Sequence, residues 1–201
     1  RRRLTTEWGS ASHRLAPMAT TTASSSTDAP VGVAVPLLDL KAQYATLRSE
    51  IEPVVREVIE SQYFIGGPAI ERLEREIAAY VHTKHAIGCA NGSDAIVLAL
   101  QALGVGQGDE VIVPTFTFFA TAGSVVRLGA RPAFVDCDPV TYNICPRSIE
   151  AALPCCRKLK AIMPVHLFGQ AADLDAVLAI GKDRGVPVVE DAAQAIGTED
   201  S

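Results

Sequence analysis

Apolar residues recur at helical spacing in the first part of the folded sequence. Between Tyr44 and Ile59 they fall every three or four positions with glutamate and arginine between them, which predicts a helix that Pro53 should kink or restart. A second apolar stripe from Ile70 to Tyr80 predicts another helix. The intervening residues 63–68 contain two glycines and a proline, so we expect either a shaped loop with exposed aromatic side chains or a plain turn stapled to the next helix.

From residue 86 onward, short apolar runs alternate with stretches of helical period. The runs predict strands at 86–90, 110–113, 131–136, 160–166 and 186–190. The stretches between them predict helices at 93–103, 118–128, 146–153 and 174–184, the last ended by Gly185. Strands that alternate with helices of this length are typical of βαβ units, so the sequence predicts an α/β fold with a largely parallel sheet.

Composition and charge narrow the function classes. Hydrophobic residues make up 48% of the 201 residues, which is enough for a packed core. A net charge of −5 argues against nucleic-acid binding, and no run of 18 apolar residues suggests a membrane span. The five cysteines have no zinc-site spacing and are expected to be reduced thiols. His82 and His85 are best explained as a solvated helix end, so no metal site is expected.

The first 34 residues differ in composition from the rest. They have no hydrophobic period and include a run rich in serine and threonine, so we expect a disordered leader, with the ordered domain at 35–201. Met18 is a candidate start, and an organellar transit peptide is the rival explanation, since the segment is rich in arginine and serine. No apolar signal-peptide core is present, and a cytoplasmic location is expected unless the transit peptide is real.

Polar side chains follow the predicted strands at the points where these end. They occur in Asn91–Asp94, Thr115–Phe118, Asp136, His166 and Asp191–Gln194. Because the carboxyl ends of parallel strands share one edge of a sheet, we expect these groups to converge on a binding site there.

Three of these segments, with an anion site, an aromatic residue and a carboxylate, point to a phosphorylated aromatic ring. Residues Gly92 to Asp94 open a helix, where free N–H groups suit a phosphate, although an ordinary N-cap has the same pattern. Asp191 ends a buried strand and invites a cationic group such as a protonated ring nitrogen, although it too could be a helix cap. Pyridoxal phosphate fits this arrangement, with its ring on Phe118 and its nitrogen paired with Asp191.

The sequence also resembles a known family. The resemblance runs from about Val35 to the end and includes segments 39–44 (Asp-Leu-Lys-x-Gln-Tyr), 63–68 (Tyr-Phe-Ile-Gly-Gly-Pro), 90–95 (Ala-Asn-Gly-Ser-Asp-Ala), 108–114 (Gly-Asp-Glu-Val-Ile-Val-Pro), 135–143 (Val-Asp-Cys-Asp-Pro-x-Thr-Tyr-Asn), 164–170 (Pro-Val-His-Leu-Phe-Gly-Gln) and 190–197 (Glu-Asp-Ala-Ala-Gln-Ala-Ile-Gly). These segments are similar to the DegT–StrS group of sugar-nucleotide aminotransferases, which are fold-type I pyridoxal-phosphate enzymes.

The resemblance implies a fold and a set of site residues. The fold is the three-layer sandwich of the large domain of PLP-dependent transferases, here incomplete and without the small C-terminal domain. The positions implied to contact the cofactor are Gly92, Ser93 and Asp94 at the phosphate, Phe118 on the ring, Asp191 at the ring nitrogen and Gln194 beside it. Tyr63 and Phe64, in a loop that resembles a family segment near the sugar site, are weaker candidates for substrate contacts. His166 is another candidate because it follows a predicted strand, and a hydrogen-bonded structural histidine is the alternative explanation.

The implied reaction transfers an amino group, usually from glutamate, to a keto group of a nucleotide-linked sugar, in a homodimer. The family's Schiff-base lysine corresponds to a position beyond Ser201, so we expect this chain to contain no catalytic residue and to be inactive alone. Two alternatives stay open: a related sugar dehydratase with histidine at the lysine position, and a truncated product without catalysis.

Overall fold

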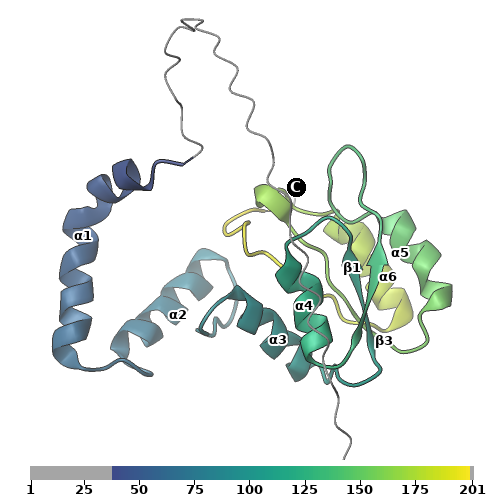
Figure 1. Ribbon diagram of the computed structural model, residues 1–201, viewed down its shortest axis with the longest axis horizontal. Helices are drawn as coiled ribbons and strands as arrows, with labels where there is room; N and C mark the ends of the chain where they lie inside the picture. The colour runs from purple at the N-terminus through teal and green to yellow at the C-terminus, as the bar shows by residue number, and fades with distance from the viewer. Residues whose placement is uncertain (1–37, 200–201) are drawn as a thin grey trace, which may run out of the picture. The chain divides into compact units, whose positions relative to one another are not determined.

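The computed structural model describes residues 38–199 (Figure 1). The predicted leader, residues 1–34, therefore lies outside the described residues. The chain divides into two compact units between Glu52 and Pro53. This division falls inside the first helix, α1 (Leu40–Ser61), which confirms the predicted helix and continues through Pro53 without a restart.

The second helix, α2 (Pro68–Tyr80), begins with its proline in the first turn, where the missing N–H is not needed. The loop before it turns through positive φ angles at Gln62 (60°) and Gly66 (62°), as expected for a shaped loop. No residue of α1 or α2 is buried, despite their apolar stripes. In the described part of the chain, no helix has the length and apolar character that crossing a membrane requires.

The predicted parallel sheet is present. It contains β1 (Glu110–Pro114), β2 (Arg131–Val135) and β3 (Leu159–Ile162) in the order β2-β1-β3, and both pairings are parallel. The predicted strand at 186–190 runs parallel beside β3, but only as separate bridges, Ile162 with Val188 and Val165 with Asp191. This segment therefore extends the sheet on the β3 side.

The predicted strand at 86–90 is wrong, because the structure has irregular backbone there. Ile87 is 84% exposed, and the Gly88 N–H donates to the Glu74 side chain (2.7 Å) rather than to a neighbouring strand. A short apolar run forms a strand only where another strand pairs with it, and no strand among residues 38–199 does so.

Two pairs of helices cover the two faces of the sheet (Figure 1). One face packs against α3 (Gly92–Ala102) and α4 (Phe119–Arg127), and the other against α5 (Pro146–Ala152) and α6 (Leu174–Arg184). These three layers, and helix bounds within two residues of those expected, confirm the predicted α/β sandwich.

Central strand β1 is buried along its whole length, because both of its faces are covered. Val111 and Val113 belong to the core on the α3/α4 side, while Ile112 belongs to the core on the α5/α6 side. Alternate residues of one strand therefore join both helical layers to the sheet.

Both ends of α6 follow the sequence signals for starting and stopping a helix. The Asp173 carboxylate caps the start by accepting a hydrogen bond from the Ala176 N–H (3.1 Å). Gly185 ends the helix in the left-handed conformation, with a φ of 63°.

We expect Ile112→Ala to lower the free energy of unfolding by about 2–5 kcal/mol, because the side chain is fully buried and truncation leaves a cavity. Val140 is 83% exposed, so Val140→Ala is the control and should change stability by less than about 0.5 kcal/mol. Urea unfolding monitored by circular dichroism measures both variants. Equal losses would contradict the assignment of Ile112 to the core.

All five cysteines are free thiols, as expected from their spacing. The backbone N–H of Ser148, at the start of α5, lowers the pKa of the Cys145 thiol. Burial raises the pKa of the Cys156 thiol, although the nearby Arg131 opposes the shift.

At about pH 8 we expect iodoacetamide to alkylate Cys145 several-fold faster than Cys156, since the thiolate is the reactive form. Peptide mass mapping after short exposures measures the two rates. The ratio should fall as the pH rises, because Cys156 then also ionises. A ratio that does not change with pH would show that access, not ionisation, sets the rates.

Candidate functional site

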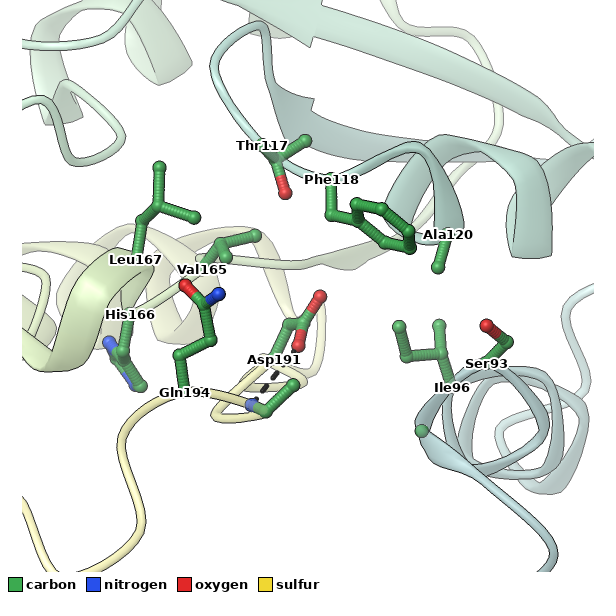
Figure 2. Close-up of a pocket in the computed structure, with 12 residues that line it drawn as sticks. Ser93, Ile96, Thr117, Phe118, Ala120, Val165, His166, Leu167, Asp191 and Gln194 are labelled. Carbon is green, nitrogen blue, oxygen red and sulfur yellow. Dashed lines mark hydrogen bonds between the residues drawn. The ribbon is translucent and has the colours of Figure 1, made fainter. Parts of the chain in front are cut away.

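A pocket lies where the carboxyl ends of β1, β3 and the segment 187–191 meet (Figure 2). It is lined by Gly92, Ser93, Ile96, Thr117, Phe118, Ala120, Val165, His166, Leu167, Asp191, Ala193 and Gln194. Four separate segments supply these residues, and each follows or opens an element of the α/β unit. Parallel topology thus places the site where open α/β sheets bind ligands.

The pocket has a volume of about 230 Å³. A cavity of about 150 Å³ is enough to hold benzene. The space therefore admits one substituted aromatic ring but not a whole nucleotide sugar.

The pocket brings together six of the nine predicted site residues. These are Gly92, Ser93, Phe118, His166, Asp191 and Gln194. Asp94, Tyr63 and Phe64 are not among the lining residues. Asp136 is also absent, because it follows β2, the edge strand farthest from segment 187–191. Which of these residues contact a ligand stays a prediction.

In the described part of the chain, Asp191 is the only carboxylate that lines the pocket, and it is 9% exposed. Its Oδ2 accepts a hydrogen bond from the Thr121 hydroxyl (2.9 Å), and its Oδ1 accepts a longer one from the Ala193 N–H (3.3 Å). Among residues 38–199, no lysine or arginine lines the pocket. A buried carboxylate without a basic neighbour in its pocket favours a cationic ligand group.

The backbone holds Asp191 in place. Its N–H donates to the Pro164 carbonyl (2.9 Å), and its carbonyl accepts from the His166 N–H (3.0 Å). These bonds continue the parallel pairing beside β3, so the position of the carboxylate depends on the sheet.

The N-terminus of α3 forms another wall of the pocket. The Asn91 side chain caps the helix by accepting from the Asp94 N–H (3.0 Å). The Asp94 carboxylate binds Arg127 (3.0 Å), so its charge is directed to α4 and not to the pocket. The N–H groups of Gly92 and Ser93, at the positive end of the helix, remain for an anion.

Phe118 and Gln194 border the pocket on different sides, and Figure 2 shows the Phe118 ring across the cavity from Asp191. Phe118 is 74% exposed, which leaves a ring face open for stacking. The Gln194 Oε1 accepts from the Phe168 N–H (3.0 Å) in the short turn Leu167–Gly169. Phe168 has a φ of 58°, a strained conformation for a non-glycine residue that this bond helps to hold.

His166 is buried, and both ring nitrogens have protein partners. Nδ1 accepts from the Ala172 N–H (3.0 Å), so the Nε2–H donates to the Glu190 carboxylate (3.0 Å). In this arrangement neither nitrogen is free for a ligand. The geometry therefore favours a structural role for His166 in the pocket wall over a direct contact with substrate.

Sequence reasoning missed Thr121, which is fully buried and donates to Asp191. The available signal was its spacing of four residues from Thr117, which places the two side chains on the same side of the turn that opens α4. It also missed the apolar wall formed by Ile96, Val165 and Leu167. Apolar residues at such positions cannot be distinguished from core residues by sequence alone.

The chain is similar to known proteins over most of its described length. Residues 45–201 match the DegT/DnrJ/EryC1/StrS aminotransferase family. A protein of Geobacillus stearothermophilus named pleiotropic regulatory protein is 59% identical over 165 residues, which cover 82% of this chain and 44% of that protein. The UDP-2-acetamido-2-deoxy-3-oxo-D-glucuronate aminotransferase of Pseudomonas aeruginosa is 47% identical over 163 residues, which cover 81% of this chain and 45% of that enzyme.

Among solved structures, NtdA of Bacillus subtilis with bound cofactor PMP has a TM-score of 0.78 and 36% identity, covering 83% of this chain and 38% of that chain. The chain thus spans less than half the length of the relatives it matches. The match over 45–201, together with the shared fold and a pocket at the carboxyl edge of its sheet, identifies the chain as a member of the DegT/DnrJ/EryC1/StrS aminotransferase family.

Proposed function

We propose that this chain supplies the pyridoxal-phosphate pocket of an aminotransferase that acts on a keto sugar nucleotide. The observation that carries the proposal is the buried Asp191 carboxylate, which opens to a ring-sized pocket across from Phe118. The sugar-nucleotide substrate of the P. aeruginosa relative supports the substrate class.

The residues present fit the cofactor. Asp191 would pair with the ring nitrogen, Phe118 would stack on the ring, and the N–H groups of Gly92 and Ser93 would hold the phosphate. Bound pyridoxal phosphate would supply an electron sink for negative charge that develops on the substrate carbon. Asp191 would keep the ring nitrogen protonated. Phe118 and the apolar wall of the pocket would orient the ring.

The finer parts of the proposal rest on family likeness. We infer glutamate as the amino donor, a homodimer as the working form and the cytoplasm as the location. The 230 Å³ pocket is comparable in size to the cofactor and too small for a whole nucleotide sugar. The nucleotide part of the substrate would therefore lie outside it.

We expect Asp191→Asn to weaken the binding of pyridoxamine phosphate by about 10- to 100-fold, because a charged hydrogen bond is lost. Asp183→Asn on α6 is the matched control, since its side chain is 77% exposed and lies outside the pocket. Isothermal titration calorimetry measures both affinities. Pyridoxamine phosphate is the suitable probe, because it binds without a covalent link to lysine.

A second comparison separates the two ends of the ligand. The Ser93 hydroxyl lines the pocket beside the N–H groups of Gly92 and Ser93 and can also donate to the phosphate. Ser93→Ala removes this donor, so it should weaken the binding of pyridoxamine phosphate but leave that of pyridoxamine unchanged, since pyridoxamine has no phosphate. Asp191→Asn should weaken both. A variant whose two affinities do not follow the expected pattern would contradict the role of that residue. If the unmodified chain binds neither ligand, the proposed function is wrong.

A regulatory role is the second candidate, because the G. stearothermophilus relative is named a pleiotropic regulatory protein. Both proposals predict that the chain folds. Only the aminotransferase proposal predicts that the pocket binds pyridoxamine phosphate. A chain that folds but does not bind pyridoxamine phosphate would favour the regulatory role.

A further inference from the structure

We propose that Thr117 and Thr121 form a directional pair of hydroxyl groups that positions the Asp191 carboxylate for a ligand in the pocket. The inference rests on the proposed function, since it concerns the same carboxylate. Thr121 is assigned as a positioning residue that acts through Asp191. Thr117 is assigned as a pocket residue that accepts a hydrogen bond from the ligand.

Two short hydrogen bonds connect the three side chains. The Thr117 and Thr121 hydroxyl oxygens are 2.8 Å apart, and the Thr121 hydroxyl donates to Asp191 Oδ2 over 2.9 Å. Thr121 is fully buried, whereas Thr117 is partly exposed and lines the pocket. The chain of bonds therefore leads from the pocket wall to the carboxylate through a hydroxyl that water does not reach.

The direction of both bonds follows from the number of protons available. An ionised carboxylate only accepts, so the single hydroxyl proton of Thr121 is used toward Asp191. Thr121 then cannot donate to Thr117, and the Thr117 proton must point to Thr121. The Thr117 hydroxyl oxygen can then only accept a hydrogen bond from the pocket side. A ligand group that binds to it must therefore be a hydrogen-bond donor.

The pair leaves the other carboxylate oxygen for the ligand. Oδ2 is held by the Thr121 hydroxyl, while Oδ1 has only the longer bond from the Ala193 N–H (3.3 Å). In Figure 2 the Asp191 side chain and the Thr117 oxygen both face the cavity. Fixing one oxygen from behind the pocket lowers the cost of ordering the carboxylate when a cation binds to the other.

The test compares variants that differ only in the hydroxyl group. Thr121→Val keeps the shape and removes the donor, and Thr121→Ser keeps the donor. Thr141→Val is the matched control, because the Thr141 hydroxyl also contacts an aspartate, Asp138 (3.5 Å), but on the surface and outside the pocket. Calorimetric titration of the full chain with pyridoxamine phosphate gives the affinities.

We expect Thr121→Val to bind pyridoxamine phosphate about tenfold more weakly, as for the loss of a hydrogen bond to a charged group. Thr121→Ser and Thr141→Val should bind within about threefold of the unmodified chain. The ¹⁵N chemical shift of the labelled ligand ring should change in Thr121→Val and return in Thr121→Ser, which lost packing alone would not produce.

Equal affinities of Thr121→Val and the unmodified chain, or equal losses in the valine and serine variants, would overturn the proposal. If the unmodified chain does not bind pyridoxamine phosphate, the proposed function is wrong. Proton NMR of the ligand-free chain then tests the hydroxyl pair by itself. A slowly exchanging Thr121 hydroxyl proton that disappears in Asp191→Ala would support the pair, and its absence from the unmodified chain would refute it. The same measurement decides the case in which Thr121→Val does not fold.

Discussion

The pairing of β1 with a parallel strand on each side is the constraint on which the rest of the structure depends. A strand in that position is covered on both faces, so its residues must be apolar and its alternate side chains must serve two cores. Parallel pairing also requires a crossover between successive strands, and these crossovers place α4 on one face and α5 and α6 on the other. The preceding helix α3 packs beside α4. The carboxyl ends of the strands then meet at one edge, where the connecting turns leave polar groups together.

The pocket is a consequence of this arrangement and not a separate feature. Asp191 is held through backbone bonds to Pro164 and His166, so the same pairing that extends the sheet sets the position of the charge. The surroundings then determine what that charge favours. Near-complete burial, an adjacent hydroxyl and a lining that includes no basic residue from the described range 38–199 together favour a cationic group over a free anion. On another wall of the pocket, the N-terminus of α3 at Gly92 and Ser93 favours an anion.

Family membership and the pocket support each other, but they carry different information. The match over residues 45–201 specifies the fold and the reaction class of many relatives, one of which is nevertheless named a regulatory protein. A fold by itself does not determine an activity. The specific content lies in the lining of the pocket, where a ring-sized volume, an open aromatic face and a positioned carboxylate coincide. This combination makes cofactor binding the decisive property to measure.

The sequence by itself determined the periods of the helices, the parallel class of the sheet, and six of the residues that meet in the pocket. These depend on local patterns: helical spacing, short apolar runs, and polar residues at the ends of strands. Only the tertiary structure decided that residues 86–90 are not a strand, that Asp94 turns to Arg127, and that Thr121 supports Asp191. Each of these outcomes is a contact, or a missing contact, between segments far apart in the chain. Thr121 and Asp191 are 70 residues apart, and no local pattern specifies which distant group a buried hydroxyl will meet.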